Sequence, residues 1–313
     1  MPSLKTIRKR ITTVKATQKI TRAMKMVAGA RLNRAQQRIT QLRPYALKTQ
    51  EVLHGVASTT LSKQVDGAPD GQREHGEHAL TDSKDAVHPL LQRRPERTAL
   101  ILVLSGDRGL CGAFNANASK AAERTWRAKK QEGIEVLFGT IGKKSRDYLI
   151  RRRATITRDF PKMYDGLDLG KAGIVADWVM GKYGKAEIDA VYVVYNEFKS
   201  AITQRTVVEQ LLPLPEPPPR PEGSLAPTEY DFEPNERAVL ERLMPMYVEV
   251  SLYRAMLESQ ASEFGARMTA MDAATRNAKD MIGRLTLAYN RARQAAITKE
   301  LMEIIGGAEA LKE

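Results

Sequence analysis

The chain has a single cysteine, Cys111, among its 313 residues. This excludes an internal disulfide and favours a reducing compartment. No stretch approaches the ~18 consecutive apolar residues that a membrane-spanning helix needs, and the first five residues, MPSLK, contain no apolar signal segment. Because 42% of the residues are hydrophobic, the chain can bury a core, and we expect a soluble intracellular protein.

Acidic residues are absent from the first fifty positions, where thirteen Lys and Arg residues precede Glu51. This segment accounts for the whole net charge of +13, since acids and bases balance at eleven each over residues 236–313. A segment this basic predicts an anionic partner, either nucleic acid, anionic lipid or an acidic protein surface, and a solvated basic face is the alternative. The bZIP arrangement is not met, because basic residues and apolar stripe share one stretch.

Sequence patterns of catalysis are also missing, since no paired carboxylates or triad spacing indicate a reaction. Residues 106–112 (GDRGLCG) have the glycine spacing G-x-x-G-x-x-G, which differs from the dinucleotide fingerprint and favours a tight structural turn over nucleotide binding. A P-loop near Gly139 fails because Leu137 and Lys144 stand where that motif needs Gly and Ser or Thr. Cys111 is interpreted as structural or incidental.

Two segments have the composition of loops. Residues 63–97 are polar and include His75, His78 and His88, for which a mobile loop is favoured over a metal site. Residues 213–227 hold seven of the fifteen prolines and predict an extended linker.

What the chain does have is coiled-coil spacing at both ends, with apolar positions at alternating steps of three and four. Toward the C-terminus this stripe is large at first and mostly alanine later, which predicts a coil that thins toward its tip. Pro245 is expected to interrupt the start of this helix. The C-terminal stripe is Val250, Tyr253, Leu257, Gln260, Phe264, Arg267, Met271, Ala274, Ala278, Met281, Leu285, Ala288, Ala292 and Ala295.

The N-terminal stripe turns polar in its middle, and we expect the neighbouring row of Ile20, Met24 and Val27 to take over there, because a straight helix drifts against a seven-residue repeat. Pro44 is expected to bend or interrupt this helix. The stripe is Leu4, Ile7, Ile11, Val14, Gln18, Thr21, Lys25, Ala28, Leu32, Ala35, Ile39 and Leu42.

Between these helices, apolar runs alternate with amphipathic stretches, which predicts an α/β domain with a partly parallel sheet. Strands are expected at 98–105, 134–141, 154–157, 190–195 and 203–211, and helices at 115–132, 144–150 and 169–183. The predicted fold is therefore a long antiparallel coiled coil of the terminal helices with a Rossmann-like α/β domain inserted between them. The predicted segments are 1–59 and 235–313 for the coiled-coil helices, 60–97 for a flexible polar insert, 98–212 for the α/β domain and 213–234 for a linker and foot.

Several stretches together resemble the gamma subunit of F-type ATP synthases over nearly the whole chain. The matching stretches are Ile7, Arg8 and Ile11, residues 17–28 (TQKITRAMKMVA), 43–45 (RPY), 105–112 (SGDRGLCG), 210–215 (QLLPLP) and 289–305 (YNRARQAAITKELMEII). The resemblance implies a non-catalytic rotor shaft without a cofactor or metal, which couples c-ring rotation to catalysis on beta.

The resemblance also implies partners and contact residues. The partners would be three alpha and three beta subunits, the epsilon subunit and the c-ring, without nucleic acid and without a membrane span of its own. The absence of a presequence favours a bacterial protein, peripheral on the cytoplasmic face of the inner membrane. Contacts with the alpha–beta ring are expected at Met24, Lys25, Arg267, Arg293, Gln294 and Thr298, and contacts with the c-ring at Tyr230, Phe232 and Glu233. The rival interpretation is a basic coiled-coil nucleic-acid-binding protein.

Overall fold

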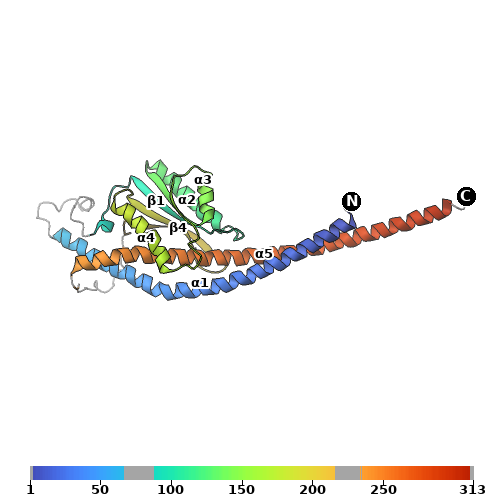
Figure 1. Ribbon diagram of the computed structural model, residues 1–313, viewed down its shortest axis with the longest axis horizontal. Helices are drawn as coiled ribbons and strands as arrows, with labels where there is room; N and C mark the ends of the chain where they lie inside the picture. Colours follow the sequence, from blue (N-terminus) through green and yellow to red (C-terminus); the bar gives the residue numbers. More distant parts are fainter. Residues whose placement is uncertain (1–2, 67–87, 216–232, 234, 311–313) are drawn as a thin grey trace, which may run out of the picture. The chain divides into compact units, whose positions relative to one another are not determined.

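The computed structural model describes residues 3–66, 88–215, 233 and 235–310. The described residues form two compact units, one from residues 1–30 and 267–313, the coiled-coil unit, and one from residues 31–266, the domain unit. The elements are α1 (Leu4–Asp66), η1 (Pro89–Leu91), β1 (Thr98–Leu104), α2 (Phe114–Gln131), β2 (Glu135–Ile141), α3 (Lys143–Ile150), β3 (Ile156–Phe160), α4 (Leu169–Gly184), β4 (Ala190–Phe198), β5 (Gln204–Leu212) and α5 (Glu236–Ala310) (Figure 1). Both long helices contribute to both units.

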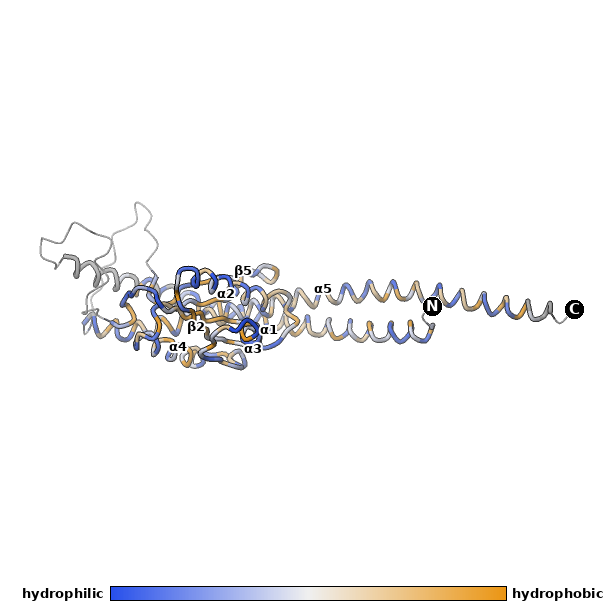
Figure 2. Tube along the Cα trace, turned by 90° about the horizontal axis from the view of Figure 1, so that it is seen from above, coloured by the Kyte–Doolittle hydropathy of each residue, from blue (hydrophilic) through white to orange (hydrophobic). Residues whose placement is uncertain are grey.

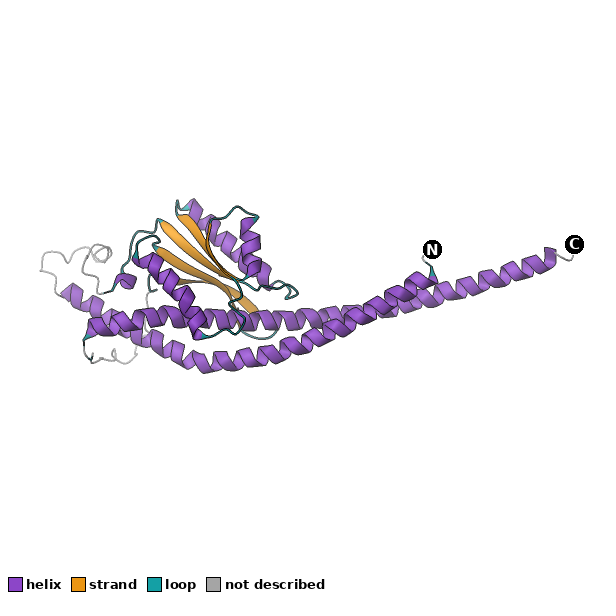
Figure 3. Cartoon of the chain, viewed as in Figure 1, coloured by secondary structure: helices purple, strands orange, loops and turns teal. Residues whose placement is uncertain are grey.

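The domain unit is built on a five-stranded sheet in the order β3-β2-β1-β4-β5 (Figure 3). Strands β3, β2, β1 and β4 are parallel to one another, and β5 is antiparallel to β4. The central strand β1 is buried in six of its seven positions, as expected for a parallel strand covered on both faces. The predicted fold class is confirmed.

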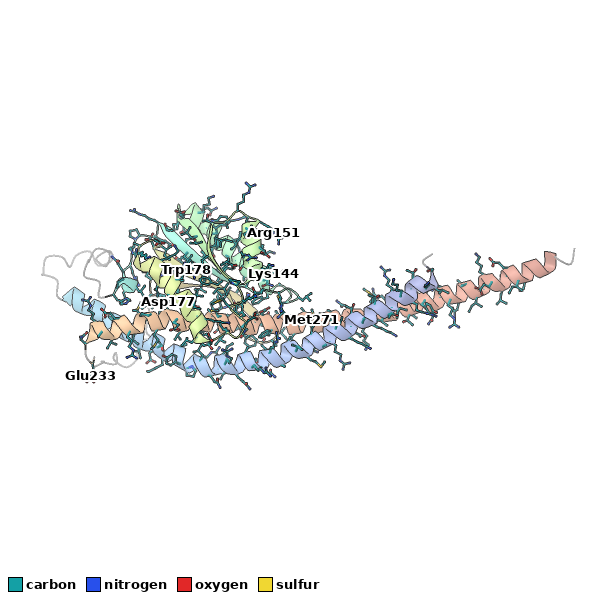
Figure 4. All side chains as sticks on the ribbon, in the orientation of Figure 1. Lys144, Arg151, Asp177, Trp178, Glu233 and Met271 are labelled. Atoms are coloured by element: carbon teal, nitrogen blue, oxygen red, sulfur yellow. The ribbon has the colours of Figure 1, made fainter. Side chains whose placement is uncertain are left out.

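Helices cover both faces of the sheet. On one face, Ala122 of α2 and Leu149 of α3 belong to one buried cluster with Ile101 and Phe138 of the sheet, and the Trp126 ring of α2 meets Phe138 edge-on at 5.6 Å between centroids. On the other face, Trp178 of α4 (Figure 4) meets Phe160 edge-on at 5.4 Å. These aromatic contacts hold the helices against the sheet.

Gly139 of β2 explains how closely α4 approaches the sheet. A Cβ at this position would lie 2.9 Å from Leu102 Cδ1 and 3.1 Å from the Trp178 ring. Only glycine fits between the strand and the helix without moving either side chain.

Within the domain unit, α1 and α5 also pack on each other. Leu32, Ala35 and Ile39 of α1 are buried. The Arg38 guanidinium donates to the Tyr253 hydroxyl at 2.8 Å, and the Tyr45 hydroxyl donates to Met246 Sδ at 3.1 Å. The two long helices are therefore joined by both apolar and polar contacts in this unit.

Neither internal proline ends its helix. Pro44 lies inside α1 and Pro245 lies inside α5, so the predicted interruption at Pro245 is wrong. An internal proline costs a helix about 3 kcal/mol. Around Pro245, however, Met244, Tyr247 and Val248 are all buried. Tertiary packing of this stretch outweighs the local preference of proline.

Sequence-based boundaries were close for most elements. The exceptions are β3, expected at 154–157 and found at Ile156–Phe160, β4, which runs to Phe198 instead of 195, and α1, which runs to Asp66 instead of 59. The edge strand β3 is exposed or half-buried except at Phe160, and it has no apolar run to mark it, whereas the inner strands do.

Candidate functional site

The stripe predicted for α1 in the coiled-coil unit is the face that the helix buries. Every predicted position from Leu4 to Ala28 is buried or half-buried, and hydrophobic and hydrophilic turns alternate along the trace (Figure 2). Met271 of α5, labelled in Figure 4, and Ala278 are buried as well. The two helices therefore pack through the seam that the spacing predicts.

Two polar positions of the seam, Thr21 and Lys25, are paired across the two helices. The hydroxyl oxygens of Thr21 and Thr275 are 2.8 Å apart. Lys25 Nζ donates to Asp272 Oδ1 at 2.5 Å, and Arg276 Nη2 lies 3.3 Å from the other carboxylate oxygen. The hydrogen bond from Lys25 holds the pKa of Asp272 below its ordinary value, so the carboxylate stays ionised at neutral pH.

The expected takeover of the seam by a neighbouring row is wrong. Ile20 is 60% exposed and Val27 is 53% exposed, while Met24 is half-buried. The helix has no need to rotate, because Thr275 and Asp272 satisfy the polar positions. Ile20 and Val27 instead remain at the surface of the coil.

Along α5 the buried row departs from prediction after Ala278. Met281 is 52% exposed, and Ala288 and Ala295 are exposed. The half-buried positions are Ile282, Leu285, Tyr289, Ala292 and Ala296. Leu285 and Ala292 are half-buried as predicted, and the other three positions move on by one residue. The change begins with two successive steps of four, from Ala274 through Ala278 to Ile282, as expected of a 3.6-residue helix against a 3.5-residue repeat.

The coil ends with a polar and aromatic contact. Arg8 Nη2 donates to the Tyr289 hydroxyl at 2.7 Å, and the guanidinium carbon lies 5.6 Å from the ring centroid. The combination of hydrogen bond and cation–π contact fixes the start of α1 on α5.

Three predicted ring contacts lie together on the exposed surface of α5. Arg293, Gln294 and Thr298 are all exposed, and the Thr298 hydroxyl donates to the Gln294 carbonyl at 3.0 Å within the helix. Beyond them, residues 297–305 are exposed throughout and include several large apolar side chains. These are Ile297, Leu301, Met302, Ile304 and Ile305.

The remaining predicted contacts are less clustered. Arg267, at the start of the C-terminal part of the coiled-coil unit, is half-buried on the seam. Glu233 is exposed and lies at the surface (Figure 4). Tyr230 and Phe232 lie outside the described residues.

The glycine-rich loop at residues 106–112 is held by its own hydrogen bonds. The Gly106 N–H donates to Asn115 Oδ1 at 2.8 Å, and the Lys143 N–H donates to Asp107 Oδ1 at 3.0 Å. Asn115 Nδ2 also donates to the Arg108 carbonyl at 3.1 Å. The Gly106 N–H, which a bound phosphate would need, is already satisfied, in keeping with a structural turn.

The described residues contain no cluster of three or more His, Cys, Asp or Glu side chains that could hold a metal ion. None of the described helices carries an apolar stretch able to cross a bilayer. His88 caps η1 by accepting the Leu90 N–H at Nδ1, while His75 and His78 lie outside the described residues.

Comparison with known proteins identifies relatives over the whole chain. The family model described as ATP synthase matches residues 3–311. The chain is 55% identical to the ATP synthase gamma chain of Sorangium cellulosum and 46% identical to that of Geotalea uraniireducens, with all of both chains covered in each case. These relatives lend no support to the nucleic-acid-binding interpretation.

Solved structures share the fold. A chain of the Euglena gracilis mitochondrial ATP synthase rotor aligns with a TM-score of 0.59 at 18% identity, covering 94% of this chain and 98% of that one. A chain of the Tetrahymena thermophila mitochondrial central stalk and c-ring aligns with a TM-score of 0.57 at 22% identity, covering 82% and 99%.

Proposed function

This chain belongs to the ATP synthase gamma family, and on that premise we propose that it is the central rotor shaft of a bacterial F-type ATP synthase. In that role it couples proton-driven rotation of the c-ring to ATP synthesis, or hydrolysis, at the catalytic sites of the beta subunits. It contributes no catalytic residue and no cofactor. It works at the cytoplasmic face of the inner membrane as a peripheral subunit.

The observation that carries this proposal is the exposed apolar end of α5. A run of exposed apolar side chains such as Leu301, Ile304 and Ile305 is typical of a surface that a partner covers. The half-buried row of the coil ends at Ala296, so the last turns present a single narrow helix. Such an end fits the axial hole of a ring of three alpha and three beta subunits.

The residues proposed to contact the alpha–beta ring follow from the resemblance, and those near the tip are also exposed. Arg293, Gln294 and Thr298 would touch the mobile region of beta near the tip, and the fixed five-donor guanidinium of Arg293 suits a carboxylate there. Arg267 would reach beta from the seam itself. Met24 and Lys25 would face the lower part of the alpha–beta ring.

Two further partners complete the rotor. Tyr230, Phe232 and Glu233 would rest on the polar loops of the c-ring, where an acidic and aromatic segment can pair with basic groups and bury a ring. The epsilon subunit would join gamma in the rotor.

The test is assembly with the alpha and beta subunits of the same complex. We expect a tagged chain to recover alpha and beta at physiological salt, and a bead on the chain to rotate when the immobilised assembly hydrolyses ATP. Recovery of DNA with a steep loss on adding salt, without alpha and beta, would instead support the nucleic-acid-binding alternative. Assembly without rotation would overturn the rotor role.

A further inference from the structure

A buried carboxylate lies where α1, α5 and the sheet meet in the domain unit. Glu258 of α5 is 5% exposed, and its Oε2 atom is buried and accepts no hydrogen bond from the described residues. An ionised carboxylate in such a place loses its hydration without replacement, which is costly.

The cation that most favours ionisation of Glu258 is already engaged elsewhere. Arg254, one turn earlier on α5, donates to Glu209 Oε1 of β5 at 2.5 Å. The Tyr195 hydroxyl of β4 donates to the other oxygen of Glu209 at 2.8 Å. The guanidinium and the hydroxyl are thus both hydrogen-bonded to Glu209, while Glu258 Oε2 has no donor among the described residues.

The other charges around Glu258 do not compensate for it. Glu197 of β4 and Glu209 of β5 oppose its ionisation, while Arg254 of α5 and Arg43 of α1 favour it. Arg43 is exposed, so water screens its charge. Glu197 has its own cations, since Lys199 Nζ lies at 2.7 Å and Arg205 Nε at 3.0 Å.

A small cavity lies beside this carboxyl. Its volume is about 10 Å³, and Ile39, Leu42, Arg43, Arg254, Leu257 and Glu258 line it. That is close to the space of one water molecule, and the exposed Arg43 stands at its α1 side. We propose that Glu258 is a proton-binding site that links the packing of β4 and β5 on α5 to pH.

In this proposal the carboxyl binds its proton more tightly while the sheet is packed on α5 than in the unfolded chain. It releases that proton as the pH rises through its raised pKa, to water for which the adjoining cavity has room. Burial is the main cause that raises the pKa of Glu258 above its ordinary value. A folded-state pKa above the unfolded one means that the native state binds more protons. The contribution of Glu258 to the free energy of unfolding is then fully present below the pH at which an ordinary glutamate titrates. It is lost as the pH rises through the folded-state pKa. The site does not depend on the rotor role.

The direct test is infrared spectroscopy of the full-length chain titrated between about pH 5 and pH 9. We expect the carbonyl band of a protonated carboxylic acid to persist above the ordinary glutamate range and to be missing in Glu258→Gln. If wild type and Glu258→Gln give the same titration, Glu258 is ionised like a surface glutamate and the proposal is wrong.

The second test measures the link to packing by hydrogen exchange of the α5 amides at residues 255–263. The equilibrium constant for local opening should rise with pH in wild type relative to Glu258→Gln. The rise across the whole titration should be tenfold for each unit by which the folded-state pKa of Glu258 exceeds its unfolded-state pKa. Glu241→Gln, which changes an exposed glutamate on the same helix, should follow wild type. Parallel pH profiles for wild type and Glu258→Gln would overturn the link. The infrared measurement on wild type decides the matter if Glu258→Gln does not fold.

Discussion

Lys25 and Asp272 are separated by 247 positions in the chain, and the Lys25 ammonium lies 2.5 Å from the Asp272 carboxylate. The Thr21 and Thr275 hydroxyls meet one turn away. Residue numbers rise along α1 while they fall along α5, so the two pairs fix an antiparallel register. A slip by one turn would separate Lys25 from Asp272 and Thr21 from Thr275. These polar seam positions therefore specify one alignment of the two helices.

This pair allows an internal role of Lys25 to be separated from a contact with the ring. Lys25→Glu would face two carboxylates with each other, and we expect fewer protons pumped per ATP hydrolysed by the reconstituted complex. The double variant Lys25→Glu with Asp272→Lys restores opposite charges across the seam but not the charge proposed to face the ring, so it should recover only part of the coupling. Lys19→Glu, an equal charge change at an exposed position of α1, is the control. A double variant with wild-type coupling would show that Lys25 acts only within the seam and would contradict the ring contact.

At the tip, Arg293→Ala combined with Gln294→Ala should lower the ATPase turnover of the assembled complex. Both side chains are exposed, so the melting temperature of the isolated chain should stay as in wild type. Arg291→Ala removes an exposed arginine two residues away and should leave turnover nearly unchanged. Wild-type turnover in the double variant would remove these residues from the contact.

The proposed foot should fail only when several contacts are lost together. An ion pair at a wet rim contributes only about 0–1 kcal/mol, so Glu233→Ala should have a small effect. Tyr230, Phe232 and Glu233 replaced together by Ala should release the alpha–beta assembly from membranes at low ionic strength while its ATPase activity persists. Sedimentation of membranes measures this, and full retention would place the attachment elsewhere.

Gly142 should tolerate no side chain. Its φ is +96°, and a Cβ there would lie 2.0 Å from the Ser105 carbonyl oxygen. Gly142→Ala should therefore lower the free energy of unfolding by about 2–4 kcal/mol. Gly181→Ala, inside α4 where a Cβ meets nothing within 4 Å, should instead stabilise the chain by about 0.4–1 kcal/mol. Urea unfolding of the full chain compares the two, and equal effects would contradict the steric argument.

The inner strands could be predicted from sequence because burial on both faces demands continuous apolar runs, as in the TALILVL of β1. The seam of α1 could be predicted from its alternating steps of three and four, even at its polar positions. The partners Asp272 and Thr275 could not, because pairing across two helices depends on a register that one helix does not contain. A signal was nevertheless present, since Lys25 occupies a seam position and Asp272 follows the seam residue Met271.

Glu258 was also missed, and the reason is different. It follows the seam residue Leu257 in sequence, where a glutamate usually reaches solvent. It is buried because α1 and the sheet both pack over this turn of α5. Exposure of the proposed contact residues at the tip, in contrast, follows once Tyr289, Ala292 and Ala296 are known to form the half-buried row.

The final turns of α5 have a consequence for assembly. A separate peptide that contained only the last turns of α5 would be mostly unfolded in water, because starting a helix costs more free energy than extending one. Here the last turns extend a helix that is already formed, so nucleation is complete before any other subunit arrives. The tip is therefore pre-organised, and little conformational entropy is lost when a binding surface closes around it.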